Sequence, residues 1–130
     1  MKSQVEKFLP AALEAVNRHF MTDDQGQPRE KIPKQFKGYI SSFGAAVIQT
    51  GLLPAVAFYS VRGSAEEERG RVIEAIFYVL RENDIVANYN NLMQFLVANR
   101  QRLDYFKPKI MDAATALKLA LRTFPIEKQD

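Results

Sequence analysis

The sequence predicts an all-α protein, a compact bundle of about six helices with a buried central helix pair. Three observations support this prediction: apolar residues recur at helical spacing in several segments, no segment alternates with the period of two that is typical of strands, and no hairpin dipeptide separates two apolar runs. The chain has 130 residues, of which 47% are hydrophobic and 25% are charged. This composition is typical of a globular protein, so we expect residues 1–130 to form a single helical domain.

The first helix is expected to begin at a capping box formed by Ser3 and Glu6 and to run to about Met21. Pro10 should kink this helix or mark where its regular part begins. The core-facing positions follow helical spacing and are Val5, Phe8, Leu9, Ala12, Leu13, Val16 and Phe20. The polar segment 22–32 comes next and is predicted to be a loop.

The most apolar stretch of the chain covers residues 38–61, which carry no charged side chain. About 20 apolar residues can cross a bilayer, but Gly51 and Pro54 interrupt this stretch where one helix would end and another begin. We therefore predict two buried helices, residues 33–50 and about 53–61, with Gly51 in a left-handed conformation between them. The buried stripe of the first is Phe36, Ile40, Phe43 and Val47.

The fourth helix is expected to begin at a second capping box, Ser64 and Glu67, and to end near Glu82. Its buried stripe should consist of Val72, Ile73, Ile76, Phe77 and Leu80. The turn and cap residues that follow are Asn83, Asp84 and Asn88, with Ile85 and Val86 tucked under the core.

A short fifth helix is predicted over about residues 89–99, with Leu92, Phe95 and Leu96 facing inward. The last helix should begin near Asp104 or Lys107, tolerate Pro108 in its first turn and end at Pro125. Its buried residues are expected to be Ile110, Ala114, Leu117, Leu121 and Phe124.

For catalytic and metal sites the sequence offers no cysteine and a single histidine. The chain contains no cysteine, which excludes disulfides, thiolate metal sites and cysteine nucleophiles. The only histidine, His19, cannot form a histidine metal site or a histidine dyad within one chain and is expected at the rim of the first helix. Glu66, Glu67 and Glu68 follow a capping serine within about one helical turn, which favours a role in stabilising the helix start over paired catalytic carboxylates.

Phosphate-binding loops, dinucleotide-binding motifs and nucleophile elbows are also absent from the sequence. Each glycine has a structural interpretation, which for Gly38 and Gly44 is close helix packing. We therefore expect a protein that is not an enzyme and that uses no cofactor and no metal. An enzyme that employs Lys, Tyr or Asp without a motif is the alternative.

The N-terminal segment carries Glu6, Lys7 and Glu14 where a secretory signal would need an unbroken apolar core. The absence of cysteine fits a reducing compartment. We therefore expect a cytoplasmic protein that does not enter a membrane.

Positive charge is concentrated at two places, although the net charge is only +3. The first includes Arg29 together with Lys31, Lys34 and Lys37, and only Glu30 offsets it. Lys34 and Lys37 should share a helix face with Ser41 and Ala45, away from the buried stripe. The second place contains Arg100, Arg102, Lys107 and Lys109, interleaved with Tyr105 and Phe106 and offset by Asp104.

Basic side chains beside small or aromatic residues suit binding to a nucleic-acid backbone, because phosphates need positive charge and close approach. The alternative is that both groups are solvated helix faces. Composition alone favours this alternative.

The central passage of the sequence shifts the interpretation of these basic groups towards nucleic-acid binding. It contains an aromatic residue within a helix, then a polar residue followed by Gly-Leu, then a second helix with Ala-Phe; the positions are Tyr39, Gln49, Thr50, Gly51, Leu52, Ala57 and Phe58. This pattern resembles the small all-helical subunit of type III-B (Cmr) CRISPR effector complexes. The helical outline agrees over the whole chain. The C-terminus departs from the family because it lacks the tryptophan and adjacent basic residues that members often carry there.

The resemblance implies a non-catalytic subunit of an RNA-guided antiviral complex, because cleavage in such complexes belongs to other subunits. It implies that copies of the chain stack along a filament of backbone subunits, with the large subunit as a further partner, and line the groove for target RNA. The expected contacts to the guide and target RNA duplex are to its phosphates, through Lys31, Lys34, Lys37, Arg100, Arg102, Lys107 and Lys109. The alternative is a helical scaffold or adaptor that binds only proteins.

Overall fold

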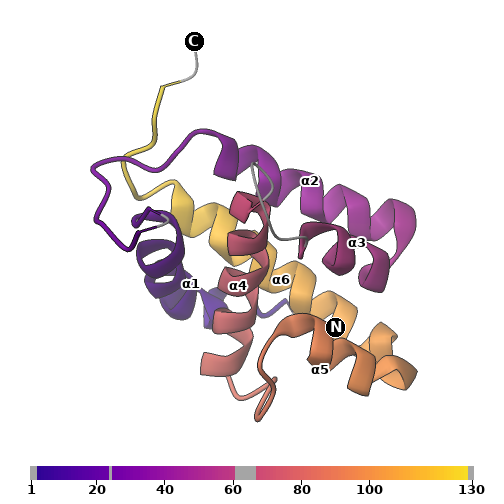
Figure 1. Ribbon diagram of the computed structural model, residues 1–130. Helices are drawn as coiled ribbons and strands as arrows, with labels where there is room; N and C mark the ends of the chain where they lie inside the picture. Colours follow the sequence, from indigo (N-terminus) through magenta and orange to yellow (C-terminus); the bar gives the residue numbers. More distant parts are fainter. Residues whose placement is uncertain (1–2, 24, 61–66, 129–130) are drawn as a thin grey trace.

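The computed structural model describes residues 3–23, 25–60 and 67–128. Within these ranges the chain forms α1 (Val5–Phe20), α2 (Gln35–Thr50), α3 (Leu52–Tyr59), α4 (Glu67–Glu82), α5 (Leu92–Ala98), the 3-10 helix η2 (Arg100–Arg102) and α6 (Leu103–Leu121) (Figure 1). The same ranges contain no strand, only two isolated β-bridges. The predicted all-α bundle is confirmed.

Helix α4 lies at the centre of the bundle (Figure 1). It packs against α1, α2, α3, α5 and α6. The predicted stripe of α4 is confirmed, and between Val72 and Leu80 every side chain except that of Glu74 is buried. A helix with neighbours on most sides must be apolar on most sides, which explains why burial extends beyond a single stripe.

Helix α1 packs against α6 and α4. Its predicted core residues Phe8, Ala12, Val16 and Phe20 are buried, whereas the prediction for Leu13 is wrong because this side chain is exposed. Pro10 lies exposed within the helix.

The predicted capping box at the start of α1 is wrong. The N-cap is Gln4, whose backbone N–H donates to Asp112 Oδ2 at 2.9 Å. Ser3 Oγ instead accepts the N–H of Val5 at 3.2 Å. Helix α1 therefore begins where a carboxylate of α6 satisfies the backbone, and local sequence could not indicate this partner.

The pair formed by α2 and α3 is buried along one side. The stripe Phe36, Ile40, Phe43 and Val47 is confirmed, and α3 contributes Leu52, Ala55, Val56 and Tyr59 to the core. The opposite side stays in solvent, with Ile48 72% and Phe58 59% exposed. The expectation of burial therefore holds for one face of the pair.

Gly51 joins the two helices with φ of 98° and ψ of 164°. The predicted positive φ is confirmed, but ψ places the residue in an extended region that only glycine adopts readily. Its N–H donates to the carbonyl of Val47 at 2.9 Å and its carbonyl accepts the N–H of Ala55 at 3.2 Å, so one residue ends α2 and starts α3.

Gly38 does not support close helix packing, because an added Cβ would have no neighbour within 4 Å. An added Cβ at Gly44 would meet only Met111 Cε, at 3.6 Å. The prediction for Gly38 is wrong because its position on α2 faces solvent. The expected end of α3 at Val61 and the second capping box lie outside the residues whose side chains the structure describes.

The connection from α4 to α5 follows the sequence closely. Asp84 and Asn88 have φ of 61° and 64°, as expected of turn residues, and Val86 is buried. Helix α5 starts later than predicted, at an Asn91 cap whose side chain accepts the N–H of Gln94. Its predicted inward residues, Leu92, Phe95 and Leu96, are all buried.

Helix α6 begins at Leu103, so Pro108 lies in its second turn, and it ends at Leu121 before the predicted Pro125. Phe124 is half-buried rather than buried. The other predicted core positions are confirmed, namely Ile110, Ala114, Leu117 and Leu121.

The segment after α6 returns to the residue that precedes Pro33. The N–H of Ile32 donates to the carbonyl of Pro125 at 2.8 Å, and the N–H of Glu127 donates to the carbonyl of Ile32 at 2.9 Å. Ile32 itself is fully buried. The start of α2 is thereby fixed to the C-terminal end of α6.

The loop before α2 is organised by one carboxylate. Asp23 Oδ1 accepts the N–H groups of Gln25 and Gln27, each at 2.9 Å. These two backbone donors, first Gln27 and then Gln25, lower the pKa of Asp23 below its ordinary value because they stabilise the ionised carboxylate.

None of the helices in the described ranges combines the length and apolar character needed to cross a membrane.

Candidate nucleic-acid interface

The first basic group lies at the entry to α2 and consists of Lys31, Lys34 and Lys37, which we call the lysine group. All three side chains are exposed. Lys34 is the N-cap of α2 and Lys37 lies in its first turn. Ser41 and Ala45, one and two turns on, are exposed as well, so the predicted shared face is confirmed. Within the described part of the chain none of the three lysines forms an ion pair.

Two acidic side chains from distant parts of the sequence lie beside the lysine group. Glu127 Oε1 accepts the backbone N–H of Lys34 at 3.3 Å. Glu68 Oε2 accepts from Gln35 Nε2 at 3.0 Å. The sequence showed only Glu30 as a local counter-charge, so the fold makes this surface less positive than the sequence indicates.

Arg29 does not extend the exposed surface of the lysine group. Its side chain is half-buried, and its Nη1 atom is enclosed without a hydrogen-bond partner among the described residues. Its charge instead acts on Asp23, where it helps to lower the pKa of the carboxyl group.

The second basic group lies at the start of α6, where Arg100 and Arg102 of η2 precede the helix and Lys107 and Lys109 lie within it. Tyr105 brings two of these cations together. Arg102 Cζ lies 4.5 Å and Lys109 Nζ 4.8 Å from the centroid of the Tyr105 ring. Arg100 instead donates from Nη1 to the carbonyl of Val97 at 3.0 Å.

Lys107 does not share the face formed by Arg102, Tyr105 and Lys109. Residues two apart on an α-helix differ by about 200° in direction, so Lys107 faces away from both Tyr105 and Lys109. Its side chain is half-buried, as is that of Lys109, so direction and not burial separates the two lysines. The structure therefore places three residues of this segment, Arg102, Tyr105 and Lys109, in one cluster.

The lysine group and the second basic group lie at opposite ends of the bundle. Ile32, next to Lys31, is hydrogen-bonded to residues just after the C-terminal end of α6. Arg102 directly precedes the N-terminal end of the same helix. Helix α6 has 19 residues, so at about 1.5 Å per residue its two ends lie about 28 Å apart. Arg102, at one end, and Lys31, beside the other, therefore cannot contact the same phosphate.

A third cationic contact was not predicted from the sequence. Arg69 Cζ of α4 lies 5.4 Å from the centroid of the Tyr39 ring and 5.3 Å from that of the Phe58 ring. Tyr59 Oη donates to the carbonyl of Tyr39 at 2.9 Å, and burial raises the pKa of Tyr59. Tyr39 and Phe58 belong to the central sequence pattern, and Arg69 of α4 thus contacts two residues of that pattern.

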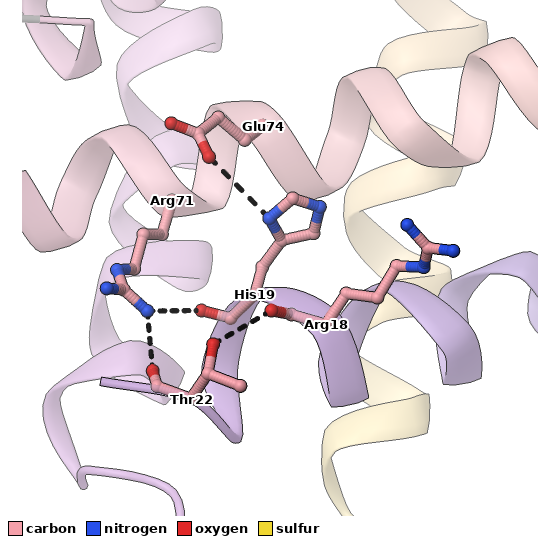
Figure 2. A network of polar contacts seen from close by, with 5 residues as sticks. All are labelled: Arg18, His19, Thr22, Arg71 and Glu74. Carbon is pink, nitrogen blue, oxygen red and sulfur yellow. Dashed lines mark hydrogen bonds and ion pairs between the residues drawn. The ribbon is translucent and has the colours of Figure 1, made fainter. Parts of the chain in front are cut away.

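His19 takes part in a contact between α1 and α4. Its Nδ1 atom lies 3.6 Å from Glu74 Oε2 (Figure 2). Arg71 Nη1 donates to the carbonyls of His19 and Thr22, at 3.0 and 2.6 Å, which satisfies backbone oxygens at the end of α1. The network in Figure 2 thus ties α1 to α4 and gives the only histidine a structural setting.

Among the described residues, no cluster of three or more His, Cys, Asp or Glu side chains could hold a metal ion.

A comparison with protein families found a match over residues 6–118 to the family described as CRISPR-associated protein (Cas_Cmr5). The matched range contains the central pattern and both basic groups, whereas Glu127 lies beyond it. Comparisons with curated proteins and with solved structures found no match. Because the family match spans most of the 130 residues, the chain belongs to the family of the small subunit of type III-B Cmr CRISPR complexes.

Proposed function

We propose that the chain is a non-catalytic subunit that stacks with copies of itself along the backbone filament of the Cmr complex and contacts target RNA phosphates. The lysine group is the primary contact. The second basic group, Arg100, Arg102, Lys107 and Lys109, is the secondary one. We also propose that residues 1–130 form one domain, since α4 contacts five other helices. The observation that carries the RNA proposal is the exposure of Lys31, Lys34 and Lys37 without an ion pair in the described chain.

Such an arrangement suits a grip on RNA that does not depend on sequence. Phosphate contacts supply affinity through released counterions and carry no base information. The small side chains of Ser41 and Ala45 on the same face of α2 leave room for a backbone to approach. Since Arg102 and Lys31 lie near opposite ends of α6, about 28 Å apart along the helix, RNA that passes along a row of stacked copies can be contacted near both ends of each copy.

Reversing the charge of Lys34 and Lys37 tests this proposal. If about four phosphates are contacted, a slope of about −0.7 per contact means that affinity falls about 50-fold between 50 and 200 mM salt. The variant Lys34→Glu/Lys37→Glu in a reconstituted complex should bind unrelated RNA sequences more weakly by similar factors and show a shallower slope. The fold should persist because both side chains are exposed.

Lys7→Glu is the control for reversing a lysine charge as such, because Lys7 is an exposed lysine of α1 outside both basic groups. Equal affinities and equal slopes for the wild type and the double variant would remove Lys34 and Lys37 from the RNA contact. Turnover that follows the purified subunit and disappears when one of its own residues is changed would contradict the non-catalytic role.

The alternative function is a helical scaffold or adaptor that binds only proteins. The exposed side chains of Ile48 and Phe58 favour protein contacts, since large apolar groups gain free energy when a partner covers them. Two results would together favour this function over the first. Partner proteins would stay bound after nuclease treatment, and RNA affinity would change neither with salt concentration nor in the lysine variants.

A further inference from the structure

Tyr105 is held at the surface in a way that helix packing does not explain. Its side chain is 48% exposed, and its hydroxyl group has no hydrogen-bond partner among the described residues. About half of the surface of this residue therefore stays in contact with water. Asp104 is the only acidic residue between Arg100 and Lys109. A large, exposed aromatic ring in a positively charged surrounding needs another explanation.

A series of aromatic rings in contact connects Tyr105 to the core. Tyr105 meets the buried ring of Phe106 edge to face, with centroids 5.0 Å apart. Phe106 meets Phe95 of α5 at 4.7 Å, and Phe95 meets Tyr89 at 5.3 Å. Edge-to-face pairs of this kind are favourable arrangements for aromatic rings. The exposed ring is therefore the outer end of a set that is anchored in the core.

The two cations beside Tyr105 are free to meet an anion. Arg102 and Lys109 rest against the Tyr105 ring, and neither forms an ion pair with a described residue. Cation–π contacts at exposed sites are weak, so a phosphate can draw either cation away without breaking a salt bridge. The site then offers an aromatic surface and two phosphate-binding side chains within one or two helical turns.

We propose that Tyr105 is a stacking site for an unpaired RNA base, with Arg102 and Lys109 on the phosphates that flank it. The proposal rests on the proposed RNA-binding function and adds a contact to a base. A duplex hides the faces of its bases within its own stack, whereas an unpaired nucleotide can place its base against an aromatic ring. This site therefore prefers single-stranded RNA to a duplex and accepts any of the four bases.

The test compares Tyr105→Leu with Tyr105→Phe in the full-length chain, alone and in the reconstituted complex. The probes are a single-stranded RNA that carries 2-aminopurine and the same RNA annealed to its complement. Stacking on an aromatic side chain predicts a loss of single-strand affinity of about 5- to 150-fold for Tyr105→Leu. Tyr105→Phe should keep the affinity and the quenching of 2-aminopurine, and duplex binding should change little in either variant.

Phe58→Leu is the matched control, because Phe58 is also exposed and also has an arginine against its ring, but lies on α3. An equal loss in this control would overturn the assignment to Tyr105. If Tyr105→Leu fails to fold, the quenching of 2-aminopurine by the wild type and by Tyr105→Phe still tests the proposal. Absence of quenching by the wild type refutes stacking.

Failure of stacking can be told apart from failure of RNA binding as such. If Arg102→Gln and the lysine variants weaken RNA binding while Tyr105→Leu binds single strands as the wild type does, the stacking proposal is wrong and the phosphate contacts remain. If none of these variants changes RNA binding, both proposals fail. A loss of assembly with other subunits at unchanged RNA affinity would show that the ring contacts a protein, which also refutes the proposal.

Discussion

The connection between α2 and α3 allows a direct test of whether its backbone conformation requires glycine at position 51. Gly51 has φ of 98° and ψ of 164°, a combination that costs an L-residue about 1–3 kcal/mol. An added Cβ would meet only Pro54 Cδ, at 3.7 Å, which is an ordinary contact. Gly51→Ala therefore isolates backbone strain, because the methyl group itself has room.

Gly38 provides the matched control on the same helix. Its position lies inside α2, it is exposed, and an added Cβ would have no neighbour within 4 Å. Alanine is preferred to glycine in a helix interior by about 0.5–1 kcal/mol. The same substitution should thus stabilise the protein at Gly38 and destabilise it at Gly51.

The size of the effect on the melting temperature follows from the chain length. An unfolding entropy of about 2.1 cal/mol/K per residue gives about 270 cal/mol/K for 130 residues, so 1 kcal/mol corresponds to about 4 °C. Thermal unfolding followed by circular dichroism should show Gly51→Ala lower by about 4–11 °C and Gly38→Ala higher by about 2–4 °C. Gly51→Val should melt at or below Gly51→Ala, since branching at Cβ adds crowding.

The opposite signs are the decisive result. If Gly51→Ala melts at the wild-type temperature, the joint does not require a positive φ. If Gly38→Ala lowers the melting temperature, another element covers this face of α2 and the exposure described here is incorrect.

Two further predictions concern contacts between helices. Asp112→Ala should remove the acceptor for the N–H of Gln4 and lower stability by about 1–2 kcal/mol, or about 4–7 °C in melting temperature, whereas Asp112→Asn keeps an acceptor and should lose less; equal losses would show that this contact contributes through charge alone. Tyr78 Oη donates to Glu14 Oε2 at 2.6 Å, and this bond, aided by burial, raises the pKa of Tyr78 above its ordinary value of 10.0. Above about pH 10 the folded state keeps the Tyr78 proton, whereas the unfolded state releases it. The contribution of this hydrogen bond to the free energy of unfolding is therefore complete below about pH 10 and is lost as pH rises through the folded-state pKa. Melting temperatures between pH 8 and 11 should fall less steeply for Tyr78→Phe, although burial also raises the pKa of Tyr59 and this keeps part of the slope; identical slopes in both proteins would contradict the role of Tyr78.

Most helices and most of their buried sides could be predicted from local sequence patterns. Helical spacing of apolar residues identified the stripe of α2 from Phe36 to Val47 and the stripe of α4 from Val72 to Leu80, because burial on one face of a helix is a local pattern. It also indicated the positive φ of Gly51, since Pro54 and the polar residues before it mark a joint. The exposure of Lys34 and Lys37 followed from the same periodicity.

Which helix surfaces are covered by other helices and which face solvent depends on how the helices pack. Apolar composition indicated that the α2–α3 pair would be buried, but α4 occupies the centre, and Ile48 and Phe58 stay exposed because no described element covers them. Contacts between residues distant in sequence also had no local signal. Asp112 fixes the start of α1, and Glu127 lies beside Lys34 because the chain after α6 pairs with Ile32. The separation of the two basic groups likewise depends on the direction in which α6 runs past α2, which only the packing of their apolar faces determines.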